Sequence, residues 1–140
     1  MSTNVLSAKT IKRTRHLVDA KDKILGRLAV DVANKLSGKG KPSFVPYLDA
    51  GDFVVLTNAK EIKVTGKKRL QKKYIRHSGF PGGLRVETFE KLINRRPEEV
   101  IRHAVKGMLP KNKLGSKMIT RLKIFSGEQH SYEKIVGGKV

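Results

Sequence analysis

The chain has 140 residues, and its 31 Lys and Arg against 12 Asp and Glu give a formal net charge of +19 at pH 7. This length supports one hydrophobic core, and the absence of cysteine excludes disulfides and Cys-ligated zinc and favours an intracellular setting. So large a charge predicts a polyanionic partner, nucleic acid first, and no apolar run is long enough to predict a membrane partner.

The first half of the chain is predicted to contain two strands and one helix. Residues 1–15 form a basic arm that leads into a short strand at 16–18. Apolar residues at helical spacing then predict a helix over 25–36, which Gly38 ends. The run 53–57 is continuously apolar and rich in β-branched residues, as in strands that bury both faces in a parallel sheet.

The second half is predicted to complete the sheet and to carry a basic segment outside it. The alternation at 62–65 predicts a third strand, and the glycine-containing segment 67–83 is expected to lie outside the core. Further elements are expected as helices at 88–94, 97–108 and 118–122, and as a fourth strand at 122–125.

Strands that alternate with helices predict the α/β class, with a sandwich built around a mostly parallel sheet. No repeat, low-complexity tract or linker divides the chain. We therefore expect a single domain over residues 16–127 with basic loop excursions, preceded by the arm at 1–15 and followed by a tail at 128–140.

Residues able to support catalysis or to bind a metal form no recognisable site. The glycines and lysines at 38–41 follow a helix and precede Pro42, whereas a P-loop follows a strand and precedes a helix. Asp49 and Asp52 lie among turn-forming residues just before a predicted strand, and their carboxylates are expected to accept hydrogen bonds from backbone amides. The four histidines are scattered, and no Gly-x-Ser-x-Gly elbow holds a serine. The sequence predicts no catalytic residue, no cofactor, no metal ion and no small-molecule substrate.

An acid-free basic segment at 67–77 is the first candidate for nucleic-acid contact. Phosphate contacts supply most nucleic-acid affinity, so its lysines and arginines suit RNA or DNA. Three aromatic rings in or near it, those of Tyr74, His77 and Phe80, are able to stack on exposed bases.

The segment 102–115 is the second candidate, because an apolar helix face there runs directly into a cationic loop. Met108 and Leu109 are expected to anchor the helix in the core. Lys111 and Lys113, which follow the Leu-Pro stop, are expected to point outward at phosphates.

Several short motifs in order carry a family resemblance. They are Val18-Asp19-Ala20, Leu25-Gly26-Arg27-Leu28-Ala29, Gly51-Asp52, Asn58-Ala59, Thr65-Gly66-Lys67-Lys68, His77-Ser78-Gly79, Gly82-Gly83 and Val105-Lys106-Gly107-Met108-Leu109-Pro110 with Leu114-Gly115. From residue 15 to residue 130 the chain resembles the L-thirteen family of large-subunit ribosomal proteins, in its bacterial form. His16 and Leu17 stand where the family commonly has Trp and Tyr, and the segment after His130 lacks the usual family ending.

The resemblance implies a three-layer α/β/α fold with a four-stranded parallel sheet. It also implies a structural, non-catalytic constituent of the large subunit, on cytoplasmic ribosomes, that binds large-subunit ribosomal RNA beside neighbouring ribosomal proteins and acts early in assembly. With the charge pattern, it gives the predicted RNA contacts: Lys12, Arg13, Arg15, Arg27, Lys39, Lys41, Lys67, Lys68, Arg69, Lys72, Lys73, Tyr74, Arg76, His77, Lys106, Lys111, Lys113, Lys117 and Arg121. Two alternatives are a non-ribosomal RNA- or DNA-binding regulator and an RNA-acting enzyme that uses Asp49, Asp52 and His77.

Overall fold

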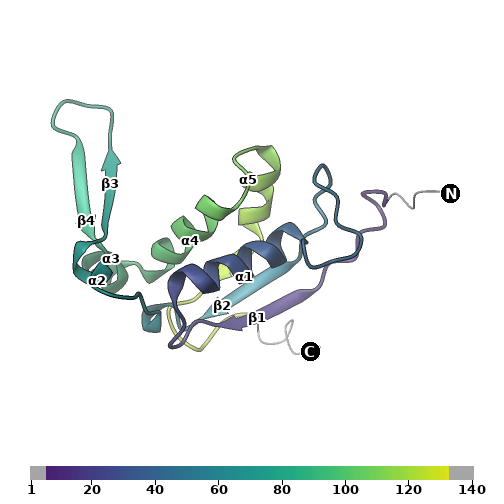
Figure 1. Cartoon of the computed structure of the whole chain (residues 1–140), viewed down its shortest axis with the longest axis horizontal. Coiled ribbons are helices and arrows are strands. Elements are labelled where there is room, and N and C mark those ends of the chain that lie inside the picture. Colours follow the sequence, from purple (N-terminus) through teal and green to yellow (C-terminus); the bar gives the residue numbers. More distant parts are fainter. Residues whose placement is uncertain (1–5, 133–140) are drawn as a thin grey trace.

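Three parallel strands form the central sheet of the computed structural model, which describes residues 6–132. They are β1 (Arg15–Asp19), β2 (Phe53–Thr57) and β5 (Leu122–Ile124), in the order β1-β2-β5 (Figure 1). The central position of β2 explains its unbroken apolar sequence. Residues 1–5 of the predicted arm and 133–140 of the predicted tail lie outside the described residues.

Helices α1 (Leu25–Ser37) and α4 (Pro97–Met108) pack against each other above the sheet (Figure 1). The core between them contains Leu28, Val32, Leu36, Val100 and Val105, each at most 2% exposed. Because the strand order advances in one direction, right-handed crossovers place both helices on the same face of the sheet. The α/β class is therefore confirmed, whereas the three-layer arrangement is not.

The prediction of a third strand at 62–65, which would make the sheet four-stranded, is wrong. Within the described residues this segment makes one parallel bridge, between Lys63 and Ile24. The Lys63 amide donates to the Lys23 carbonyl, and the Leu25 amide donates to the Lys63 carbonyl. The segment follows the short 3₁₀ helix η1 (Ala59–Glu61) and meets the loop that enters α1, beyond the end of β1, so no longer ladder forms.

A β-hairpin carries the basic segment away from the sheet. After the single turn α2 (Lys68–Gln71), strands β3 (Lys73–His77) and β4 (Leu84–Thr88) pair antiparallel and project at one end of the molecule (Figure 1). The expected excursion is confirmed except at Tyr74, which is 9% exposed and belongs to the core cluster. The sequence did not predict the strand pairing of the hairpin. Helix α3 (Phe89–Arg95) follows at once, and the Thr88 hydroxyl caps it by accepting from the Lys91 amide.

The junction of α4 with α5 (Lys113–Thr120) corrects one core prediction. Leu109 is 5% exposed and anchors the chain as expected, whereas Met108 is 45% exposed. Helix α4 ends at Met108, and the extended backbone at Leu109 turns only the second of the two side chains into the core. Helix α5 begins earlier than predicted, and β5 ends one residue short of the predicted strand.

Candidate nucleic-acid interface

A basic hollow of about 690 Å³ lies between the hairpin strand β3 and helix α4. Lys72, Lys73 and Arg76 line it from the hairpin side, and Arg102 and Lys106 line it from α4. The α4 residues recur at helical spacing and therefore share one face, while the opposite face of α4 is buried in the core. We call this hollow the β3–α4 groove.

Contacts across the groove hold the hairpin against α4. Arg76 Nη2 donates to Glu99 Oε2 at 2.5 Å, and the Tyr74 and His103 rings meet edge to face, with centroids 5.5 Å apart and planes at 86°. Burial raises the pKa of Tyr74. The hydrogen bond from Arg96, supported by one from Arg76, lowers the pKa of Glu99. The groove therefore contains a charged carboxylate that orients an arginine.

A second hollow, of about 590 Å³, continues the basic surface to the start of α5. It shares His103 and Lys106 with the first hollow and reaches Lys111. Asn112 Oδ1 accepts from the Gly115 amide at 2.9 Å and caps α5. A Cβ on Gly115 would lie 1.8 Å from the Pro110 carbonyl oxygen, so only glycine permits this close turn. The cationic loop is thereby fixed beside the groove.

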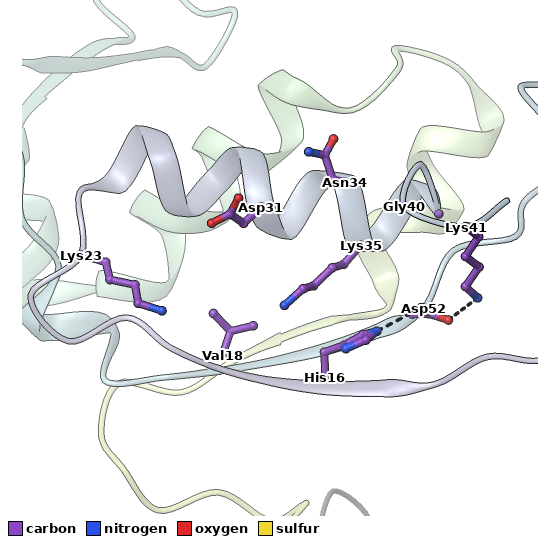
Figure 2. A pocket seen from close by; sticks show the side chains of 10 residues that line it. His16, Val18, Lys23, Asp31, Asn34, Lys35, Gly40, Lys41 and Asp52 are labelled. Carbon is purple, nitrogen blue, oxygen red and sulfur yellow. Dashed lines mark hydrogen bonds and ion pairs between the residues drawn. The ribbon is translucent and has the colours of Figure 1, made fainter. Parts of the chain in front are cut away.

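A third hollow, of about 440 Å³, lies beside α1 and β1, and Figure 2 shows its lining side chains. Asp52, whose side chain is 7% exposed, accepts from the Thr14 amide at 2.9 Å and from Lys41 Nζ, and lies 3.0 Å from His16 Nε2. Burial alone raises the pKa of Asp52, but these hydrogen bonds outweigh it and hold the pKa of Asp52 below its ordinary value. Lys41 also donates to the Lys12 carbonyl and so joins the arm to the domain.

Arg121 is buried in the same region, with a side chain that is 6% exposed. Its Nη1 and Nη2 donate to the two carboxylate oxygens of Asp49 at 2.5 and 2.6 Å, and Nη2 also donates to the Leu36 carbonyl at 2.9 Å. The structure assigns Arg121 to the core, in place of the predicted RNA contact, because an internal carboxylate binds its guanidinium. Asp52 accepts from a backbone amide as expected, whereas the Asp49 carboxylate binds the Arg121 guanidinium instead.

The sequence matches the family model for ribosomal protein L13 over residues 13–131. The chain belongs to the ribosomal protein L13 family. It is 54% identical over 125 residues to the large ribosomal subunit protein uL13 of Rippkaea orientalis, covering 89% of this chain and 83% of that protein. It is 52% identical over 132 residues to the uL13 protein of Nitratidesulfovibrio vulgaris, covering 94% of this chain and 92% of that protein.

Membership of the L13 family confirms the resemblance that the motifs carried. It makes the chain a structural, non-enzymatic protein, which removes the RNA-acting enzyme as an alternative. Among the described residues, no group of three His, Cys, Asp or Glu side chains is placed to hold a metal ion. None of the helices in residues 6–132 has the length and apolarity needed to cross a membrane.

Most of the predicted RNA contacts of this L13 chain are exposed, but the structure does not gather them at one place. The exposed ones are Lys12, Arg13, Arg15, Arg27, Lys39, Lys67, Lys68, Arg69, Lys72, Lys73, Arg76, His77, Lys106, Lys111, Lys113 and Lys117. The hairpin lies at one end of the long axis and the N-terminal side at the other (Figure 1). The predicted contacts are therefore spread along the long axis of the molecule.

Two predicted contacts besides Arg121 are not exposed, and two groove residues were not among the predicted contacts. Tyr74 is 9% exposed and packs on α4, so its ring is not free for a base. Lys41 is bound to Asp52. Arg102 and His103 line the groove; they fall in the candidate segment 102–115 but were not among the predicted RNA contacts. Their spacing from Lys106 on a predicted helix was the available signal.

Proposed function

We propose that this chain binds large-subunit ribosomal RNA, chiefly through phosphate contacts, and supports early assembly of the subunit. One observation carries the proposal: five Lys and Arg residues from two separate elements surround the β3–α4 groove, which contains a single carboxylate. Cations on both walls of a groove suit a polyanion held by its phosphates. Membership of the L13 family makes ribosomal RNA the polyanion of choice.

The proposed contacts are the exposed basic residues given above, together with Arg102. His77 and Phe80 add rings near the tip of the hairpin, where Phe80 is 74% exposed. The segment that leads into β1 and the connection that follows α1 lie toward the other end of the molecule, and they contain Lys12 and Lys39 (Figure 1). Contacts at both ends would fix the relative positions of two RNA segments, which is a scaffolding role.

The same proposal includes neighbouring large-subunit proteins as partners and the cytoplasmic ribosome as the location. The division into an arm at 1–15, one domain at 16–127 and a tail at 128–140 stays a prediction. In its favour, one core cluster contains residues of β1, α1, β2, α3, α4, α5 and β5.

The test is the salt dependence of binding to large-subunit RNA fragments. We expect log K to fall linearly with log salt concentration, with a slope proportional to the number of phosphates contacted. Replacing Lys67, Lys68 and Lys72 together with Ala should lower the slope by about three and leave thermal stability nearly unchanged, because all three side chains are exposed. An affinity that stays flat between low and moderate salt would refute the phosphate mechanism.

Competition separates the ribosomal role from the remaining alternative, a non-ribosomal regulator. Structured ribosomal RNA should displace duplex DNA of equal charge. The reverse preference would contradict the proposed function.

A further inference from the structure

We propose that the β3–α4 groove seats an unpaired nucleobase of the bound RNA, stacked on the ring of His103. The inference rests on the proposed function, since the RNA supplies the base. It adds that the protein recognises a single-stranded feature, such as a bulged nucleotide, in addition to the phosphate backbone.

His103 is the exposed aromatic side chain at the centre of the basic surface. It lines both the 690 Å³ and the 590 Å³ hollows and shares that position only with Lys106 among their lining residues. The ring therefore borders both hollows. A base entering either hollow meets it.

Tyr74 supports the His103 ring and does not bind the base itself. The two rings are nearly perpendicular, at 86°, with centroids 5.5 Å apart, which fixes the plane of the exposed imidazole. Tyr74 is 9% exposed, and Lys72 Nζ lies 5.7 Å from its ring centre. The aromatic pair thus combines a buried support with an exposed platform.

The surroundings of His103 suit a nucleotide better than a bare phosphate. Leu92, which is 2% exposed, and Tyr74 give the groove an apolar floor. Arg102 and Lys106 flank His103 on the same helix face and are placed for the phosphates on either side of a base. In a paired helix the base faces are covered by their neighbours, so only an unpaired base can stack on the ring.

The experiment uses the full chain and two short RNA stems that differ only by one unpaired 2-aminopurine nucleotide. At low salt the protein should bind both stems, because its net positive charge attracts their phosphates. We expect tighter binding of the bulged stem and quenching of its fluorescence as the base stacks. His103→Ala should lower affinity for the bulged stem by about 5- to 100-fold, leave its salt slope unchanged, and leave binding of the paired stem unaltered.

The matched control is Lys106→Ala, which lies on the same helix face and borders both hollows. It should lower the salt slope by about one for both stems without a preference for either. His103→Phe should retain the preference for the bulged stem. Urea unfolding of each variant shows whether the α4 face remains folded.

Two outcomes would overturn the inference, and they are distinguishable. Equal, steeply salt-dependent binding of both stems, unaffected by His103→Ala, would refute base stacking and leave the phosphate mechanism standing. Binding of neither stem at low salt would refute the proposed function and the inference with it. A preference for the bulged stem that His103→Ala removes and His103→Phe retains supports the inference.

Discussion

Arg121 and Arg102 are the same residue type in a chain of net charge +19, yet one is buried and paired inside the fold and the other is exposed at its surface. Arg121 is 6% exposed and bidentate to Asp49, and it links β5 to the α1–β2 connection. Arg102 stands exposed on α4 and lines the β3–α4 groove. Arg121 therefore stabilises the fold, whereas the exposed Arg102 is available to bind a partner.

The difference shows that positive charge has two uses in this protein. In the Asp49–Asp52 region, the partly buried Asp49 carboxylate binds Arg121 and the buried Asp52 carboxylate binds Lys41. Paired hydrogen bonds offset the cost of desolvating these charges. Around the groove, Glu99 is the one lining carboxylate and cations outnumber it. Burial of the basic side chain together with an acidic partner decides which use applies: Arg121 is 6% exposed, whereas Arg76 pairs with Glu99 but keeps a side chain that is 61% exposed.

The largest effect is expected for Arg121→Ala. Removing one member of a buried ion pair leaves Asp49 without its bidentate partner and should cost about 3–5 kcal/mol of unfolding free energy, measured by urea denaturation. Any RNA affinity measured on the folded fraction should keep the wild-type salt slope. A variant with unchanged stability and a reduced slope would place Arg121 among the RNA contacts after all.

Gly51→Ala tests the packing of the same buried region without changing charge. A Cβ on Gly51 would lie 1.6 Å from the Leu36 carbonyl oxygen and 2.9 Å from Arg121 Nη2, so the backbone must move. We expect a loss of about 1–3 kcal/mol in unfolding free energy. Gly40→Ala is the matched control, because nothing lies within 4 Å of its added Cβ. Equal stability of the two variants would contradict the close packing of Gly51 against the Leu36 carbonyl.

The double change Arg102→Ala and Lys106→Ala tests the groove side of the comparison. Both side chains are exposed, so stability should change by less than about 0.5 kcal/mol. RNA affinity should fall roughly tenfold at moderate salt, with a salt slope lowered by about two. Filter binding across a salt series measures both quantities. Marked destabilisation with unchanged slope would make these residues structural, like Arg121.

Asn112→Ala tests a residue that has a structural role next to the basic surface. Asn112 caps α5 and thereby positions the basic residues beside it. Loss of its hydrogen bond from the Gly115 amide should cost about 1 kcal/mol in the thermal or urea transition. Asn112→Asp should retain the cap. An Ala variant as stable as the wild type would show that Gly115 and the tight turn at Pro110 fix the loop alone.

The smallest effect is expected for the contribution of Asp52 to the pH dependence of stability near neutral pH. Its pKa is lowered in the folded chain, so its stabilisation is present above the unfolded pKa of about 3.9 and is lost as the pH falls through the lowered folded value. Between pH 7 and pH 5 this carboxyl should contribute no slope. Below that range Asp52→Asn should lose less stability on acidification than the wild type, as measured by unfolding at successive pH values.

Strong local patterns were sufficient to predict much of this fold. The stripe on α1 and the apolar run of β2 gave both elements within a residue, because each buries a face with one clear period. The hairpin was missed because its strands carry lysines and arginines beside exposed Ile75 and Val86, which hides the alternation. The pairing also joins two segments, β3 and β4, that are separated along the chain by the hairpin tip.

The sequence by itself determined the α/β class, the basic character, the expectation of a nucleic-acid partner and, through its motifs, the family. Only the tertiary structure decided the number of strands in the described sheet, the placement of α1 and α4 on one face of it, and which cations are buried. The physical reason is distance along the chain. Arg121 meets Asp49, and Arg76 meets Glu99, across long sequence separations, so pairing and burial exist only once the chain has folded.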